Sequence, residues 1–253
     1  MRIFRVVLAI ASMEEMITST THISISEKGK RKKNEDVYYP LNGEVGENLF
    51  FVCDGIGGHG DGDLAAAFVQ LQLPEIIAKQ NTFSKAAIEA SLIETNASLM
   101  RYAHQVGNLH MGCTVAVLQL EDDSAIIAWV GDSRVYHIRG EEILFKTKDH
   151  TLFELMLENE ELSPEEALNF PMKHVIYQAL GPKNNSLKAS IESVENVLPG
   201  DMFLLVTDGV LEAWDEKDLV KSIHNGGLKS VDEIKSRCAL LSKDNYTFTL
   251  VAV

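Results

Sequence analysis

The sequence contains few cysteines and no long apolar segment, and both absences exclude classes of protein. Its three cysteines, Cys53, Cys113 and Cys238, lie far apart in 253 residues. This spacing excludes a disulfide framework and a paired-cysteine zinc site, and none of the three has the arginine six positions later that an arginine-assisted cysteine nucleophile needs. The apolar run from Val6 to Ala11 is far shorter than the ~20 residues of a membrane-spanning helix, so we expect no membrane partner.

Positive charge is also scarce. Lysine and arginine number 23 against 37 aspartates and glutamates, which gives a formal net charge of −14. A protein that binds duplex nucleic acid needs a basic face, so we expect no nucleic-acid partner. Surplus carboxylate is what a divalent-cation site requires, although a solvated acidic surface has the same composition. The position of the acids therefore matters more than their number.

Length and composition indicate a single globular domain over residues 17–253. Hydrophobic residues make up 45% of the chain, and no proline- or serine-rich linker divides it. Residues 1–16 are a leader of uncertain status. Their short apolar stretch follows Arg5 and faintly resembles a secretory signal, but a leader strand or a start upstream of Met13 or Met16 fits better.

Hydrophobic periodicity predicts strands in groups, separated by helices. Strands are expected at His22–Ser26, Leu49–Cys53, Thr114–Leu120, Ala125–Val130, Arg134–Arg139, Ile143–Phe145, Ile191–Val197, Met202–Thr207 and Tyr246–Ala252. Helices are expected on the stripes Leu64, Ala67, Phe68, Leu71 (ending or bending near Pro74) and Ile88, Leu92, Leu99, Tyr102, and at Thr151–Glu160, from Ser163, at Lys217–His224 and at Val231–Leu241. The short breaks between the central strands favour hairpins, so we predict an α+β fold with two face-to-face antiparallel sheets covered by helices.

Acidic residues follow the ends of several apolar strands. Asp54-Gly55 and Asp208-Gly209 each end a buried strand, and Gly131-Asp132 is a variant with the glycine first. A lone Asp-Gly is usually a turn, but several acids leaving strand ends are expected to meet at one edge of the sheets. Carboxylates brought together unpaired raise their own pKa values and cost stability unless cations lie between them.

Further charged residues fall within reach of the same edge. Glu35-Asp36 and Asp244 can join the carboxylate cluster. Three lysines offer an alternative in which the cluster is neutralised without a metal: Lys32, Lys33 and Lys243. The residues alone leave both possibilities open.

Taken in order, these motifs resemble one family. They are Glu35-Asp36 preceded by Arg31, Asp54-Gly55 with Gly57-Gly58 behind, Gly112-Cys113-Thr114, Gly131-Asp132-Ser133-Arg134, Lys148-Asp149-His150, Thr207-Asp208-Gly209 and Asp244-Asn245. Together they are similar to the metal-dependent protein phosphatases, the type 2C or PPM superfamily, in their compact bacterial form. The resemblance covers about Ile17 to Val253 and implies a four-layer α-β-β-α sandwich, with a two-metal centre at one end of the sheets.

The resemblance also implies a role for each acid. Asp54 would bridge both metals, Gly55 would give a carbonyl oxygen to one of them, and Asp208 and Asp244 would complete the other. The remaining metal ligands would be Glu35 and Asp36, with Asp132 at an additional metal position, and Arg31 would grip the substrate phosphate. The catalytic set is then Asp36, Asp54, Asp208 and Asp244.

The implied activity is hydrolysis of phosphoserine and phosphothreonine on proteins by a metal-bound hydroxide, opposing a protein kinase. We expect a cytoplasmic monomer that acts on phosphorylated proteins. Because all candidate ligands are oxygens, Mn²⁺ or Mg²⁺ is favoured, with two core ions and a possible third. Two such ions ~3.5–4 Å apart can hold a shared hydroxide and neutralise the phosphoryl oxygens. An arginine suits the phosphate because its planar fork makes two parallel bonds.

One position departs from the animal-type pattern, which has a histidine after Asp-Gly as a proposed general acid. Here that residue is Ile56. Either a metal-bound water protonates the leaving alcohol or His59 does, although a loop histidine with a structural role is the better interpretation of His59. His150 is likewise interpreted as a turn or capping residue.

Two other functions compete with catalysis. A silent phosphoprotein-binding module would keep the fold but lose bridging or terminal aspartates. Here all four aspartates of the catalytic set are present: Asp36, Asp54, Asp208 and Asp244. A calcium-stabilised domain would need the spacing and closing glutamate of a calcium loop, which Asp54–Asp63 lacks. Substrate choice is expected to lie in a flap over residues 146–185, where Glu158–Glu161 would disfavour acidic phosphopeptides.

Overall fold

The computed structural model describes residues 20–41, 48–57, 61–163, 166, 170–181 and 186–253. The expected leader at residues 1–16 lies outside this part, as does His59. The strands are β1 (Thr21–Glu27), β2 (Val37–Tyr39), β3 (Leu49–Cys53), β4 (Gly55–Ile56), β5 (Gly112–Cys113), β6 (Val115–Glu121), β7 (Ser124–Val130), β8 (Arg134–Arg139), β9 (Glu142–Lys146), β10 (Ser190–Glu195), β11 (Met202–Val206) and β12 (Tyr246–Ala252). The helices are α2 (Gly62–Gln80), α3 (Lys85–Gln105), α4 (Leu152–Glu158), α6 (Asp208–Ala213), α7 (Glu216–Gly226) and α8 (Ser230–Leu241).

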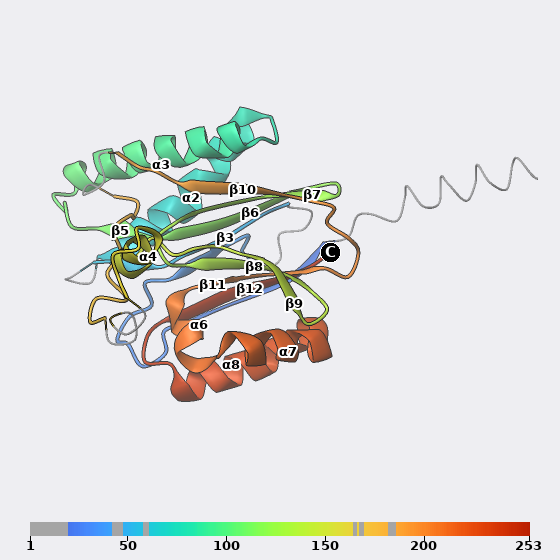
Figure 1. Ribbon diagram of the computed structural model, residues 1–253. Helices are drawn as coiled ribbons and strands as arrows, with labels where there is room; N and C mark the ends of the chain where they lie inside the picture. Colours follow the sequence, from blue (N-terminus) through green and yellow to red (C-terminus); the bar gives the residue numbers. More distant parts are fainter. Residues whose placement is uncertain (1–19, 42–47, 58–60, 164–165, 167–169, 182–185) are drawn as a thin grey trace, which may run out of the picture.

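Two five-stranded antiparallel sheets lie face to face. One has the order β1-β12-β11-β8-β9 and the other the order β10-β7-β6-β3-β2, and a small pair, β4-β5, stands beside them. Helices α2 and α3 cover the second sheet, while α6, α7 and α8 cover the first (Figure 1). The predicted four-layer α-β-β-α sandwich is therefore confirmed.

Each interface between layers has its own apolar core. Leu73, Leu92 and Leu99 of α2 and α3 pack on the outer face of one sheet. Phe50 and Phe203 belong to the core between the two sheets. A third core joins the other sheet to α6, α7 and α8. Strand β3 is buried along its whole length, as its continuous apolar sequence predicts.

The first predicted helix differs from the structure in its buried face. Leu64 and Leu71 of α2 are 40% and 66% exposed, so these two members of the predicted stripe do not face the core, whereas Phe68 packs against it. The face against the core instead carries Ala65 and Ala66 in its first turns, and the helix approaches β4 closely at Gly62, where a Cβ would stand 2.4 Å from the carbonyl carbon of Gly55. The helix also continues through Pro74 to Gln80. No helix among the described residues is long and apolar enough to span a bilayer.

Candidate metal centre

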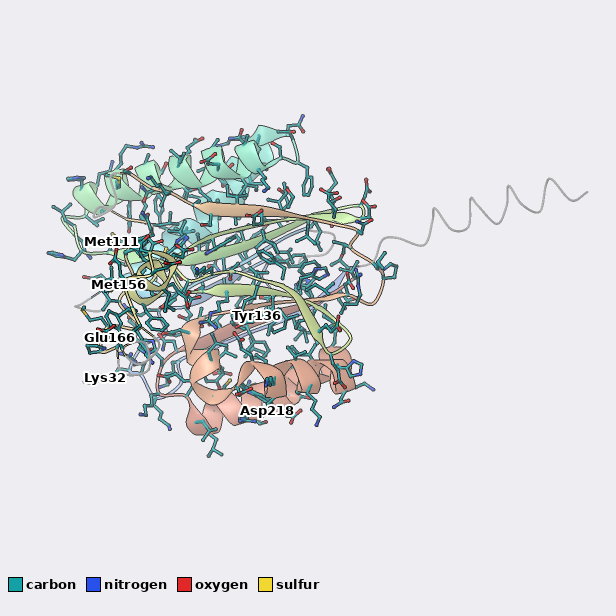
Figure 2. All side chains as sticks on the ribbon, in the orientation of Figure 1. Lys32, Met111, Tyr136, Met156, Glu166 and Asp218 are labelled. Carbon is teal, nitrogen blue, oxygen red and sulfur yellow. The ribbon has the colours of Figure 1, made fainter. Side chains whose placement is uncertain are left out.

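All the proposed metal ligands emerge at one end of the two sheets. Asp54 directly follows β3, Asp132 follows β7 and Asp208 follows β11, while Asp36 precedes β2 and Asp244 lies just before β12. Because these strands are antiparallel neighbours within their sheets, strand ends and strand starts alternate along the same edge. Lys32, Met111 and Met156, from loops and a helix at this end, gather there in Figure 2. The fold thus brings together residues that are up to 208 positions apart.

Thr114 connects the Asp54 and Asp132 segments. The backbone N–H of Asp54 donates to the Thr114 hydroxyl at 3.0 Å, and the N–H of Thr114 donates to the carbonyl of Asp54 at 2.9 Å. The same hydroxyl shares a 2.7 Å hydrogen bond with the hydroxyl of Ser133, next to Asp132. Thr114 and Ser133 are buried, so these bonds hold two acidic turns rigidly against each other.

A second set of bonds joins the Asp36 segment to Asp208 and Asp244. The hydroxyl of Thr207 donates to the Asp36 carboxylate at 2.8 Å, which places Asp36 beside the start of α6. Asn245 accepts a hydrogen bond from the N–H of Glu35 at 2.9 Å. The Asp36 segment is therefore tied to the start of α6 through Thr207 and to the Asp244 segment through Asn245.

Asn245 also anchors the basic turn that carries Arg31. Its side-chain amide donates to the carbonyls of Lys28 and Lys33 at 2.9 and 2.8 Å. The turn passes so close to the chain before β12 that a Cβ on Gly29, at φ +55°, would stand 2.0 Å from the carbonyl oxygen of Asp244. The Asp244-Asn245 motif therefore positions both a carboxylate and the arginine turn.

The carboxyl groups raise one another's pKa. Burial raises the pKa of Asp36 and of Asp132 to about 7, with added repulsion from Asp208 in both cases. Burial and then repulsion from Asp244 raise the pKa of Asp208 to about 6. The pKa of Asp54 lies well above its usual value, because of burial and then the charges of Asp36 and Asp208. This pattern shows that the predicted acids do converge.

Positive side chains do not remove that repulsion. Lys33 forms an ion pair with Asp63 at 2.6 Å, outside the acidic set. Arg31 forms an ion pair with Asp244, and its side chain is 60% exposed. Neither lysines nor Arg31 stand among the main influences on the pKa of Asp54 or Asp36. The alternative in which lysines neutralise the cluster is not supported at these two carboxyls.

Three oxygens of the set are buried without a hydrogen-bond partner: Glu35 Oε1, Asp36 Oδ1 and Asp132 Oδ1. A buried carboxylate oxygen without a partner lowers the stability of the fold, and a bound hard cation would compensate its charge. Among the described residues, no group of three or more His, Cys, Asp or Glu side chains is already placed to hold a metal ion. The donor set nevertheless fits a hard divalent cation, because every member is an oxygen.

The segment after β9 packs against the Gly131-Asp132 turn. The His150 ring accepts a hydrogen bond from the N–H of Gly131 at 3.2 Å and shares one with the Ser190 hydroxyl at 2.9 Å. Arg134 makes a two-bond ion pair with Asp149, at 2.7 Å for each bond. His150 is therefore a turn residue, in agreement with its sequence interpretation, and the motif that precedes β8 and the motif that follows β9 form one structural unit.

Sequence reasoning missed the residues that hold the ligands in place. Thr114, Thr207 and Asn245 were seen only as parts of motifs, although each bonds across the site. Glu212 of α6 was not singled out, yet its carboxylate accepts from the N–H groups of Lys243 and Asp244 at 2.7 and 3.2 Å. For two of them a signal was available in the sequence, since Thr207 precedes Asp208 and Asn245 follows Asp244.

Comparison with known proteins agrees with this architecture. Residues 16–155 match the family model described as Protein phosphatase 2C. The chain is 31% identical over 206 residues to protein phosphatase PhpP of Streptococcus pneumoniae, covering 76% of this chain and 80% of that protein. The chain belongs to the protein phosphatase 2C family.

Solved structures give the same result. The chain is similar to serine/threonine phosphatase Stp1 from Staphylococcus aureus, with a TM-score of 0.80 and 26% identity over 93% of this chain and 96% of that one. It also shares its fold with the catalytic domain of the phosphatase PstP in complex with two manganese ions, with a TM-score of 0.75 and 22% identity over 92% and 97% of the two chains. This family member is a protein serine/threonine phosphatase, an enzyme of a metal-dependent family whose substrates are phosphorylated proteins.

Proposed function

We propose that this phosphatase cleaves its substrates at the acidic end of the sandwich, where two divalent cations, Mn²⁺ or Mg²⁺, would be held. The observation that carries the proposal is the set of three buried carboxylate oxygens without hydrogen bonds, within a cluster whose pKa values are raised. The neighbour with two manganese ions supports the number and kind of ions. The proposed ligands are Glu35, Asp36, Asp54, Gly55, Asp208 and Asp244, with Asp132 serving a third position.

The chemistry is the transfer of a phosphoryl group from a serine or threonine oxygen to water. When bound, the cations would activate the attacking water and neutralise charge on the phosphoryl oxygens. The protein's own contribution is to hold the carboxylates in place before substrate arrives, through Thr114, Thr207 and Asn245. The P–O ester bond breaks and the alcohol takes up a proton, leaving inorganic phosphate and the free hydroxyl.

Arg31 is proposed as the residue that binds the substrate phosphate. Its guanidinium is exposed at the mouth of the site and already contacts a carboxylate, Asp244. A phosphate offers the same pair of oxygens to the planar fork. Ile56 has no proton to give, so the proton for the leaving alcohol comes from water or from another side chain.

The biological setting and the domain organisation of the enzyme complete the proposal. We propose that the enzyme opposes a serine/threonine kinase, works in the cytoplasm as a monomer, and binds neither nucleic acid nor membrane. The segment 146–185 is proposed as the flap beside the site within one catalytic domain, residues 17–253. The complete set Asp36, Asp54, Asp208 and Asp244 favours catalysis over silent binding.

A metal titration with a matched pair of variants tests the site. The purified chain should hydrolyse a phosphothreonine peptide only with added Mn²⁺ or Mg²⁺, and chelator should abolish turnover. Asp54→Asn should remove nearly all activity, whereas Asp218→Asn, at a carboxylate 60% exposed on α7, should change it little. Full turnover in metal-free buffer, or a wild-type rate for Asp54→Asn, would refute the assignment.

A further inference from the structure

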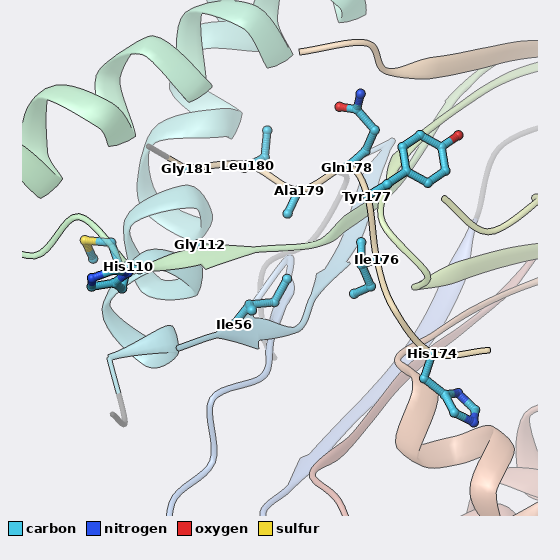
Figure 3. Close-up of a pocket in the computed structure, with 11 residues that line it drawn as sticks. Ile56, His110, Gly112, His174, Ile176, Tyr177, Gln178, Ala179, Leu180 and Gly181 are labelled. Atoms are coloured by element: carbon cyan, nitrogen blue, oxygen red, sulfur yellow. The ribbon is translucent and has the colours of Figure 1, made fainter. Parts of the chain in front are cut away.

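A pocket of about 380 Å³ opens next to the acidic cluster. One wall is Ile56, the residue that follows the proposed ligand Gly55, and the other is the returning part of the flap, His174 and residues 176–181 (Figure 3). Its volume falls at the small end of the ~300–1,000 Å³ typical of ligand pockets.

The wall of the pocket is mostly apolar. Figure 3 shows the side chains of Ile56 and Ala179 pointing into the space between the two segments, while Tyr177 and Gln178 point away from it. Met111 also lines the pocket. Ile56 therefore gives an apolar side chain to the wall that adjoins the proposed ligand Gly55.

Backbone pairing fixes the pocket against the site. Ile56 pairs with Gly112 in the β4-β5 ladder, and Cys113 exchanges two hydrogen bonds with Leu180, at 3.0 and 2.8 Å. The flap wall is thus tied through β5 to the same short strand that follows Asp54.

The opposite side of the pocket faces α6. His174 lines the pocket there. His174 lies close enough to Asp208, the first residue of α6, to interact with it electrostatically. With its phosphate bound at the acidic cluster, a substrate could therefore place a residue one or two positions from the phosphorylated one against the apolar wall.

We propose that this pocket binds an apolar side chain of the phosphoprotein, one or two residues from the phosphorylated serine or threonine. The proposal deepens the proposed function and rests on it. An extended peptide rises about 3.3 Å per residue, so a side chain one or two positions from the phosphorylated residue stays close to the phosphate. A pocket that adjoins the turn of the proposed ligands Asp54 and Gly55 is close enough to receive it. Acidic neighbours would be disfavoured, because the described residues that line the pocket include no lysine or arginine and the carboxylates of the adjoining cluster repel them.

The wild-type enzyme tests this with paired peptides. Phosphothreonine peptides should differ only in one residue, leucine or asparagine, placed in turn from two residues before to two after the phosphothreonine. Burying a leucine side chain corresponds to roughly ten- to hundredfold in affinity, and partial burial lowers this to about tenfold. We expect kcat/KM to favour leucine by about tenfold at one position.

Two variants map that preference onto the pocket. Ala179→Leu fills the space and should reduce the leucine preference to about twofold or less. Ile56→Ala enlarges it and should shift the preference from leucine toward tryptophan. Ala90→Leu is the control, because it makes the same change as Ala179→Leu but on the exposed face of α3. It should retain the wild-type preference. Thermal unfolding of each variant shows that it is folded, and the Ile56→Ala result stands even where Ala179→Leu fails to fold.

The outcomes separate the pocket from the catalytic assignment. Hydrolysis of every peptide with no preference above about twofold would overturn the pocket proposal and leave the proposed function intact. An unchanged preference in both Ala179→Leu and Ile56→Ala would place the subsite elsewhere and also overturn it. No hydrolysis of any peptide in the presence of Mn²⁺ would overturn the proposed function itself.

Discussion

Gly209 lies directly against the backbone of Asn245, so closely that a Cβ on Gly209 would stand 1.9 Å from the Asn245 carbonyl oxygen. The two residues follow Asp208 and Asp244 in the sequence. Their contact is therefore what brings two proposed ligands of the same metal side by side. The glycine is needed for this approach, because any side chain would push the two segments apart.

Gly209→Ala should destabilise the protein by about 1–3 kcal/mol and impair catalysis, because the backbone of Asn245 cannot yield without moving Asp244. Urea unfolding and the Mn²⁺ dependence of kcat/KM measure the two effects. Gly226→Ala is the control: its Cβ would meet only the Ser230 side chain, at 3.2 Å. A Gly209→Ala enzyme with wild-type stability and metal affinity would show that the contact is not what positions the pair.

Asp54→Asn should stabilise the metal-free protein while it removes activity. Burial and the charges of Asp36 and Asp208 hold the pKa of Asp54 well above its usual value, so the ionised form costs stability at neutral pH. We expect a gain of about 1 kcal/mol, or roughly 2–4 °C in Tm, at pH 7.5 with chelator.

Adding Mn²⁺ should reverse this order. The wild type gains stability because the ion binds the folded state, whereas the variant has lost a ligand and gains less. Differential scanning fluorimetry with and without Mn²⁺ measures both. A lower Tm for Asp54→Asn in chelator would contradict the repulsion inferred for this cluster.

The strands were predictable from sequence, because their apolar patterns are local. The predicted β12 matches the structure at both ends, Tyr246–Ala252, and β8 does as well. The helix α2 was predicted, but Leu64 and Leu71 of its predicted stripe are exposed. Periodicity gives weight to large side chains, whereas the buried face carries the small side chains of Ala65 and Ala66.

The meeting of several acids at one edge of the sheets was also predictable, since acids at strand ends form a visible pattern. How they are held was not. The bonds from Asn245 to Lys33 and from Thr207 to Asp36 join residues 212 and 171 positions apart. The short helix α6 was not predicted, because it starts at the Asp-Gly pair and spans only six residues. Such contacts depend on the packed sheets and leave no periodic signal.

Asp201 should make the protein acid-sensitive at the end of the sandwich away from the site. Its carboxylate accepts hydrogen bonds from Arg139 at 2.6 and 2.7 Å and from the N–H of Leu198 at 3.0 Å, and shares one with His137 at 2.7 Å. Burial opposes ionisation, but these bonds outweigh it and lower the pKa of Asp201 to about 2. The folded-state pKa is below the unfolded one, so the stabilisation is fully present above about pH 4 and is lost as pH falls toward 2.

Asp201→Asn should therefore cost about 2 kcal/mol at pH 7, and the difference from wild type should shrink as pH falls from 4 to 2. Chemical unfolding across that range measures it. Asp218→Asn, at an exposed carboxylate, should stay within about 0.5 kcal/mol of wild type. If the loss of stability in Asp201→Asn did not depend on pH, the negative charge of Asp201 would not be the source of its stabilising effect.

Arg31→Lys should weaken substrate binding more than it slows turnover. Lysine keeps the positive charge but loses the planar fork that grips two phosphate oxygens, so one charge-assisted bond is lost. We expect KM for a phosphothreonine peptide to rise about tenfold, with a smaller change in kcat. The exposed Arg31 side chain makes its ion pair with Asp244 at the surface, so the fold should tolerate the change and Tm should fall by no more than a few degrees.

Arg101→Lys is the matched control, since Arg101 lies on α3 and bonds only locally, to Ser98. A tenfold KM increase in Arg31→Lys alone would support its role in phosphate binding, whereas an unchanged KM would remove Arg31 from the substrate site.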